Sequence, residues 1–272
     1  MTKNEKVLSL LSKERYYFDD LVTIMELLRG ECGCPWDREQ THKSIRKDFI
    51  EETYEVIEAI DTEDTELLRE ELGDVLLQVV FHARIEEEAG AFNIDDVAND
   101  ICTKLIHRHP HVFADVSVSG SSDVLRNWEN IKSEEKSRNT VTDKLRAIPP
   151  MLPALMRAQK VGKKASAFDF PDTASVFLKL EEEIAELKEA IASGSGKACF
   201  EELGDVLLTV TSLARKIGVD SEEALSGSVN KFIDRFSELE EDVSSRGLDM
   251  NELTQEELDA IYDEQKARKR QI

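Results

Sequence analysis

The stretch that decides the fold runs from Leu180 to Val210 and reads LEEEIAELKEAIASGSGKACFEELGDVLLTV. Its apolar residues recur every three or four positions on both sides of the Ser-Gly-Ser-Gly segment at residues 193–196. That spacing is typical of amphipathic helices, and the glycine-rich segment is typical of a turn. The stretch therefore predicts two antiparallel helices joined as a hairpin.

Carboxylates occupy matched positions on the two predicted helices. Glu186 and Glu202 are equidistant from residue 194, and so are Glu183 and Asp205. Residues equidistant from a turn lie level with each other in an antiparallel hairpin, so these four carboxylates are expected within one helical turn. Four such charges repel one another unless a cation compensates them, and carboxylate oxygens are the ligands that Mg²⁺ and Mn²⁺ prefer.

The same acidic signature occurs earlier in the chain, at a constant offset of 131 residues. Glu55 and Glu71 are equidistant from residue 63, in the polar segment at residues 61–65, and so are Glu52 and Asp74. Surface charges seldom keep a register for packing, so two copies with identical spacing indicate a task for the carboxylates themselves. The sequence predicts two metal sites, with the ligands Glu183, Glu186, Glu202 and Asp205 in the second copy and Glu52, Glu55, Glu71 and Asp74 in the first.

Two details of the repeat refine this prediction. A di-iron carboxylate bundle would use Glu-x-x-His on two of its helices, and neither copy has His at the partner positions. We therefore expect Mg²⁺, with Mn²⁺ as a substitute. Each copy also contains a glycine, Gly73 or Gly204, which costs roughly 1 kcal/mol in a helix relative to Ala. We expect this glycine to let a neighbouring helix or a ligand approach closely.

The whole chain of 272 residues is predicted to be all-α. It contains only 12 Gly and 6 Pro, and strand-like alternation is nearly absent. Three prolines within residues 149–153 cannot lie inside a helix, so they mark a break. With the repeat, this predicts two tandem four-helix-type modules, at residues 1–145 and 146–272.

The formal net charge of −22 limits the partners of the chain. It argues against nucleic acid, whose phosphates require an excess of cationic side chains, and against an anionic membrane surface. A small anionic substrate is compatible with it where a bound metal ion supplies positive charge. The four cysteines form no Cys-x-x-Cys pair, which favours a reducing, cytoplasmic setting. Neither a signal peptide nor a membrane-spanning stretch is expected.

Several motifs together resemble the MazG family of nucleoside triphosphate pyrophosphohydrolases, in the all-α NTP-pyrophosphatase superfamily. Both halves match the family pattern of Glu-Glu-x-x-Glu followed by Glu-x-x-Asp. Residues 33–37 (GCPWD), 70–74 (EELGD), 108–113 (RHPHVF) and 152–160 (LPALMRAQK) resemble the tandem type found in bacteria. Any one of these motifs is weak alone, whereas the set is specific and covers essentially the whole chain.

The resemblance implies a reaction and a metal. A nucleoside triphosphate would be hydrolysed between its α and β phosphates to a nucleoside monophosphate and pyrophosphate, with Mg²⁺ as cofactor. Glu182 and Glu183 are the candidates for the general base, and the sequence does not choose between them. Removal of aberrant nucleotides is the implied purpose. A homodimer is also expected, because the hairpins expose apolar faces of the kind that pack on a partner.

The resemblance also implies nucleotide contacts. Lys231 and Arg235 match a family pair that contacts the phosphates, and Lys179 lies one turn before Glu183. Tyr262 matches a late aromatic residue that stacks near the base, although the family has Trp there. The full set of implied nucleotide-binding residues is Lys179, Lys231, Arg235, Tyr262 and Lys266, with Lys104 and Arg108 as the counterparts in the first half. A lysine is also expected where this chain has Ala198.

Other readings of the sequence stay open at this point. One is a narrower deoxynucleotide or phosphoribosyl-ATP pyrophosphatase. A second is a non-catalytic helical regulator that binds nucleotide or a toxin–antitoxin partner and keeps the acids as relics. A third is an acidic helical scaffold without a nucleotide site. Turnover that depends on Mg²⁺ separates the enzymes from the other two.

Overall fold

The structure is a computed structural model that describes residues 2–135 and 140–269, without the side chains of 129, 130, 133, 134 and 266–269. The described residues form helices, turns and loops and contain no strand. The all-α prediction is therefore confirmed. The chain divides into two compact units, Met1–Lys132 and Ser133–Ile272, called here unit 1 and unit 2.

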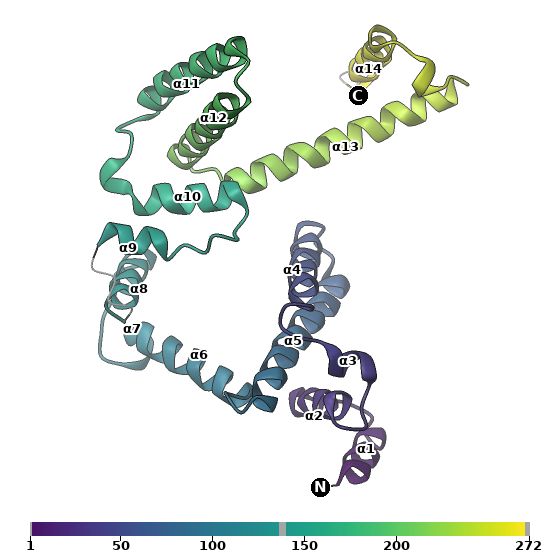
Figure 1. Cartoon of the computed structure of the whole chain (residues 1–272), viewed down its shortest axis with the longest axis vertical. Helices are drawn as coiled ribbons and strands as arrows, with labels where there is room; N and C mark the ends of the chain where they lie inside the picture. Colours follow the sequence, from purple (N-terminus) through teal and green to yellow (C-terminus); the bar gives the residue numbers. More distant parts are fainter. Residues whose placement is uncertain (1, 136–139, 270–272) are drawn as a thin grey trace. The chain divides into compact units, whose positions relative to one another are not determined.

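Unit 1 is built around one long helical hairpin (Figure 1). Its elements are α1 (Lys3–Leu11), α2 (Phe18–Arg29), α3 (Pro35–Glu39), α4 (Arg46–Asp61), α5 (Thr65–Glu88), α6 (Ile94–Arg108), α7 (Pro110–Phe113) and α8 (Ser121–Glu135), whose last residues belong to unit 2. Helix α4 pairs with α5, and α2 packs on α5. The core consists of Met25, Ile45, Val80 and Phe81, all nearly inaccessible to solvent.

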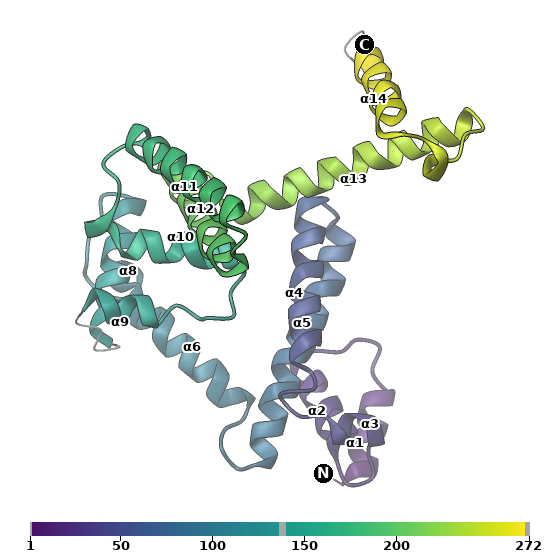
Figure 2. The same cartoon turned by 45° about the horizontal axis from the view of Figure 1, so that its top comes forward.

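Unit 2 repeats the hairpin with α11 and α12 (Figure 2). Its elements are α9 (Val141–Arg146), α10 (Ala154–Lys164), η1 (Ser166–Phe168), α11 (Thr173–Ser193), α12 (Gly196–Lys216), α13 (Ser221–Ser245), η2 (Met250–Glu252) and α14 (Gln255–Lys269). Helix α10 packs across α12 and the start of α13, and α14 folds back on α13. The structure divides the chain at residues 132/133, earlier than the 145/146 boundary predicted from the prolines, because α9 contacts α10 within unit 2.

Local chemistry at the two turns explains why both hairpins form. In unit 1 the Asp64 side chain caps α5 by accepting hydrogen bonds from the backbone N–H groups of Glu66 and Leu67, both at 3.0 Å. In unit 2 Gly194 ends α11 in the left-handed region with φ 70°, which glycine adopts without strain. Ser195 then caps α12 through the N–H of Ala198. These caps fix the register that brings the repeated carboxylates level.

At the end of each hairpin opposite its turn, side chains also hold the two helices together, but the interactions differ between the units. In unit 2 Asp169, just before α11, forms ion pairs with Arg215 and Lys216 at the end of α12, the latter at 2.9 Å. These contacts hold the pKa of Asp169 far below its usual range, mainly through the hydrogen bonds from Arg215. In unit 1 the tie is made by two histidines, His42 before α4 and His82 on α5, at 2.7 Å.

Candidate active site

Three glutamates converge on the α11–α12 hairpin of unit 2. Glu183 and Glu186 come from α11 and Glu202 from α12, and one carboxylate oxygen of each lies within 4.8 Å of the others. Glu183 is only 6 % exposed, whereas Glu186 is open to solvent. Asp205, the predicted fourth ligand, lies one turn further along α12, is exposed, and is outside this group of three. The three oxygens suit a hard divalent cation.

A lysine compensates this cluster. The Lys179 ammonium lies 3.0 Å from Glu183 and 2.7 Å from Glu182. These hydrogen bonds raise the pKa of Lys179, so the side chain stays charged. The pKa of Glu186 is raised by desolvation, a shift that Lys179 opposes and that the charges of Glu183 and Glu202 increase. The site therefore combines oxygen ligands with one fixed positive charge on the same face of α11.

The hairpin of unit 1 holds a second cluster with the same geometry. Glu52 and Glu55 of α4 and Glu71 of α5 each place one oxygen within 4.8 Å of the others. Burial raises the pKa of Glu52 to about 6, with further contributions from the charge of Asp74 and a hydrogen bond to Glu55. Burial and Glu55 likewise raise the pKa of Glu71. Both predicted rungs of this hairpin are thus close enough to interact.

The charge beside the two clusters differs. At the repeat offset of 131 residues, Lys179 of unit 2 corresponds to Asp48 of unit 1. The carboxylates of unit 1 therefore lack the lysine that offsets repulsion in unit 2. Carboxylates crowded enough to raise a pKa by repulsion and burial are a donor set that fits a divalent cation, because the ion removes both penalties. By this criterion both hairpins fit Mg²⁺.

The explanation offered for the two repeated glycines needs correction. A Cβ atom added at Gly73 or at Gly204 would meet no heavy atom within 4 Å in the described part of the chain. Neither glycine is therefore required for close packing between helices of one chain. Both glycines lie beside carboxylates of the clusters and face open space. They therefore leave room for a ligand or for a second chain to approach the carboxylates.

The cations implied on the C-terminal helices are exposed. Lys231 and Arg235 lie on α13, which leads away from the α11–α12 hairpin in both views (Figures 1 and 2). Tyr262 is half-buried on α14, and the side chain of Lys266 is outside the described residues. Within the described part of unit 2, no hydrogen bond or ion pair joins Lys231 or Arg235 to the carboxylate cluster. Among the described residues of unit 2, Lys179 is the cation that forms ion pairs next to the cluster.

The two counterparts in unit 1 have different environments. Lys104 is exposed on α6. Arg108 is only 6 % exposed, and its guanidinium lies 5.4 Å from the centre of the Trp128 ring. His109 meets the same ring edge-on at 4.9 Å. The structure thus packs Arg108 against an aromatic ring rather than presenting it to solvent.

A polar cluster at the end of the unit 1 hairpin was not anticipated from the sequence. His42 Nδ1 lies 2.7 Å from His82 Nδ1, and His42 Nε2 lies 2.7 Å from a carboxylate oxygen of Glu86. A signal for it does exist in the sequence. Asp74, Gln78, His82 and Glu86 follow one another at intervals of four residues, which places them on one face of α5.

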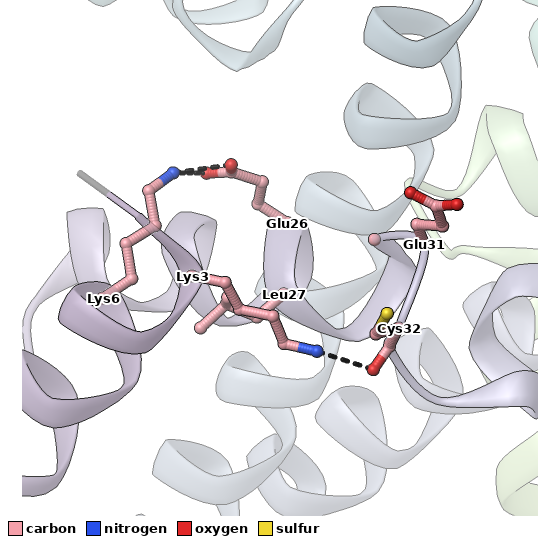
Figure 3. Close-up of a pocket in the computed structure, with 7 residues that line it drawn as sticks. Lys3, Lys6, Glu26, Leu27, Glu31 and Cys32 are labelled. Atoms are coloured by element: carbon pink, nitrogen blue, oxygen red, sulfur yellow. Dashed lines mark hydrogen bonds and ion pairs between the residues drawn. The ribbon is translucent and has the colours of Figure 1, made fainter.

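Figure 3 shows a pocket between α1 and α2, and none of the residues that line it belongs to a carboxylate cluster. It has a volume of about 290 Å³ and lies near the N-terminus of unit 1. Its two cations are engaged within the chain, because Lys6 pairs with Glu26 at 2.5 Å and Lys3 donates to the Cys32 carbonyl at 2.7 Å.

Comparison with known proteins finds the same repeated domain. The family described as "MazG nucleotide pyrophosphohydrolase domain" matches residues 40–113 and 171–239, which contain the two carboxylate hairpins. A Thermotoga maritima protein named "Nucleoside triphosphate pyrophosphohydrolase/pyrophosphatase MazG" is 45 % identical over 251 residues, 92 % of this chain and 95 % of that protein. The Escherichia coli "Nucleoside triphosphate pyrophosphohydrolase" is 45 % identical over 253 residues, 91 % and 96 % of the two chains.

The match to a mycobacterial relative covers a smaller part of both chains. The Mycobacterium tuberculosis "Nucleoside triphosphate pyrophosphohydrolase" is 46 % identical over 154 residues, 56 % of this chain and 46 % of that protein. Among the described residues, none of the helices has the length and apolar character needed to cross a membrane.

Proposed function

The chain belongs to the MazG family of nucleotide pyrophosphohydrolases, and from this premise we propose that it hydrolyses nucleoside triphosphates at the α11–α12 hairpin. The products are a nucleoside monophosphate and pyrophosphate, and the cofactor is Mg²⁺, which Mn²⁺ can replace. The observation that carries the proposal is the joint placement of three glutamate oxygens and the Lys179 ammonium on one helical hairpin. A triphosphate needs both a metal ion and an organic cation.

The proposed roles of the residues in unit 2 follow from how exposed each side chain is. The buried Glu183, with Glu186 and Glu202, would hold the ion, and the exposed Asp205 lies one turn away as a further ligand. When bound, Mg²⁺ neutralises phosphate charge and polarises the phosphoryl group toward attack. Lys179 would orient the phosphates as a point charge.

Glu182 is the better placed of the two general-base candidates. Its side chain is 57 % exposed, and Lys179 engages it at 2.7 Å. Binding of a triphosphate would draw Lys179 away and leave the Glu182 carboxylate open to accept a proton from water. The water oxygen then bonds to phosphorus as the bridging α–β phosphoanhydride bond breaks. Glu183, buried and close to the other ligands, is better suited to holding the metal ion.

A homodimer would account for the exposed apolar side chains of unit 2 and for the distance of its cations from the carboxylates. Phe232, Ile233 and Phe236 of α13 are exposed, and so are Phe200 and Leu203 of α12. Exposed large apolar side chains grouped on one helix, as on α13, often mark a protein–protein interface. A partner chain would cover these side chains and bring cations such as Lys231 and Arg235 to a carboxylate cluster. Light scattering should give twice the chain mass, and Ile233→Glu should lower it toward that of one chain.

The physiological role proposed is the removal of aberrant nucleotides in the cytoplasm. We expect no nucleic-acid or membrane partner, since a net charge of −22 repels polyphosphates that do not bring cations. A panel of triphosphates tests this role directly. Aberrant bases should give higher kcat/KM than the four common nucleotides, whereas a preference for one deoxynucleotide or for phosphoribosyl-ATP would assign a narrower pyrophosphatase.

Product analysis tests the reaction itself. Purified full-length protein, a nucleoside triphosphate and Mg²⁺ should release pyrophosphate and the monophosphate, and chelation of the metal should stop the release. Orthophosphate as the first product would refute cleavage between the α and β phosphates. Nucleotide binding without any turnover would instead favour a non-catalytic regulator.

A further inference from the structure

In unit 1 two imidazole rings, those of His42 and His82, face each other through a ring nitrogen of each. A contact that only holds two helices together does not require this geometry. The rings of His42 and His82 are parallel within 6°, with centroids 5.0 Å apart, and their Nδ1 atoms face each other at 2.7 Å. At that separation one nitrogen must donate a proton and the other accept it. The same end of the unit 2 hairpin is tied by ordinary ion pairs of Asp169, without any imidazole.

The residues around the pair resemble those that surround metal-binding histidines. His42 Nε2 lies 2.7 Å from Glu86, so the ring can donate its other proton to a carboxylate. Histidines that ligate metals almost always make this contact, which fixes the tautomer and makes the facing nitrogen a better ligand. Phe49 packs edge-on against His82 at 5.9 Å and shields it on one side. The two Nδ1 atoms thus face each other, one as donor and the other as acceptor.

A buried side-chain oxygen lies one turn away on α5. Gln78 is 7 % exposed, and within the described part of the chain its side-chain oxygen has no hydrogen-bond partner although it is buried. Buried polar atoms are nearly always satisfied, so an unpartnered one requires an explanation. Gln78 lies four residues before His82 and four after Asp74, on the face they share.

We propose that His42 and His82 bind a divalent transition-metal ion of the imidazole-preferring class, such as Zn²⁺, at a site separate from the carboxylate clusters. Two nitrogens at about 2.0 Å from a tetrahedral ion are roughly 3.3 Å apart, so the rings need to separate by ~0.6 Å and to tilt until both lone pairs meet the ion. The proton that the two Nδ1 atoms share leaves to solvent on binding. Glu86 orients His42, and water with the Gln78 oxygen completes the coordination.

This site differs from the carboxylate clusters in the ion it selects. Clustered carboxylates favour Mg²⁺ and Mn²⁺, whereas imidazole favours Zn²⁺, Cu²⁺ and Ni²⁺. It is also confined to unit 1. At the repeat offset, Gln78, His82 and Glu86 correspond to Thr209, Leu213 and Ile217, none of which carries an imidazole or a carboxylate. The inference does not depend on nucleotide hydrolysis at the other hairpin.

Pulsed electron paramagnetic resonance with Cu²⁺ as the probe tests the site in the full-length protein. Excess Mg²⁺ is present to occupy the carboxylate clusters, whose oxygens give no nitrogen signal in any case. The wild-type protein should show modulation from imidazole nitrogen at one equivalent of Cu²⁺, and Zn²⁺ should displace the ion. His82→Asn should remove that signal, while the control His107→Asn, in the other histidine-rich segment, should keep it.

A second variant keeps the test decisive if His82→Asn fails to fold, which circular dichroism without metal would reveal. Glu86→Gln alters only the contact that orients His42 and should weaken Cu²⁺ binding by roughly 10–100-fold, the usual effect of losing such a partner. The proposal is overturned if the wild-type protein shows no nitrogen modulation, if His82→Asn retains it, or if Glu86→Gln binds Cu²⁺ as tightly as the wild type.

Discussion

The hairpins α4–α5 and α11–α12 present the same three glutamates in different electrostatic surroundings. In unit 2 Lys179 contacts two carboxylates, whereas in unit 1 the equivalent residue is Asp48. The pKa of Glu52 rises to about 6 in the uncompensated cluster. A repeated set of carboxylates therefore does not imply repeated chemistry, because the charges around the carboxylates decide which anion can approach.

The largest expected difference between the hairpins concerns turnover. Glu183→Gln should lower kcat for pyrophosphate release by about 100-fold or more, since it removes a proposed ligand of the metal ion that stabilises the reacting phosphate. Glu52→Gln, the matched change in unit 1, should leave kcat within about twofold. Both variants are assayed with saturating nucleotide and Mg²⁺. The prediction that unit 2 carries the turnover is contradicted if Glu52→Gln lowers kcat as much as Glu183→Gln does, or if only Glu52→Gln is inactive.

Removal of the lysine should have the next largest effect. Lys179→Ala deletes a charge-assisted contact worth about 1.5–3 kcal/mol, which corresponds to roughly a 10–100-fold loss of kcat/KM. Lys188→Ala, an exposed lysine on the same helix, is the matched control and should change little. Equal kinetics for the two variants would mean that Lys179 only compensates the cluster and does not meet the substrate.

The response to pH should distinguish the clusters further. Because the pKa of Glu52 is raised from 4.5 to about 6, the folded state holds this proton more tightly than the unfolded state. Stability without metal should therefore fall as pH rises from about 4.5 to about 6, and divalent ions should restore it above that range. Thermal melts of wild type and Glu52→Gln measure this. An identical pH profile for the two would show that Glu52 is not the titrating group.

Binding at the unit 1 cluster should weaken on acidification for the same reason. Below pH 6 a cation must displace the proton of Glu52, so affinity should fall by up to about tenfold per pH unit. Mn²⁺ binding to the Glu183→Gln variant isolates unit 1. Asp48→Lys, which supplies the charge found in unit 2, should flatten the dependence because a nearby cation lowers the carboxyl pKa. An unchanged slope in Asp48→Lys would contradict this account.

The smallest predicted effect concerns the base. Tyr262→Trp enlarges the aromatic surface on α14 and should lower KM by roughly 2–10-fold if the ring stacks on the nucleotide, in line with an aromatic contact of about 0.5–1.5 kcal/mol. Tyr262→Phe, which keeps the ring, should stay near the wild type. A KM that follows the hydroxyl rather than the ring size would indicate a hydrogen bond instead of stacking.

Much of the fold was predictable because it depends on short-range rules. Helical periodicity, the glycine of residue 194 and the polar turn near residue 63 were enough to place both hairpins and to group three carboxylates on each. The domain boundary was less predictable, since prolines mark where helices stop and not which helices pack together. The contact of α9 with α10 assigns that helix to unit 2.

The sequence by itself determined the helices, the repeat and the matched spacing of the acids, because backbone geometry converts residue spacing directly into faces and levels. Only the tertiary structure decided which charges meet. It paired Asp169 with Arg215, packed Arg108 against Trp128, and brought His42 to His82 from residues 40 positions apart. Burial and contact between distant segments depend on how helices pack, and no local pattern in the chain encodes the distances that set a pKa or form a ligand site.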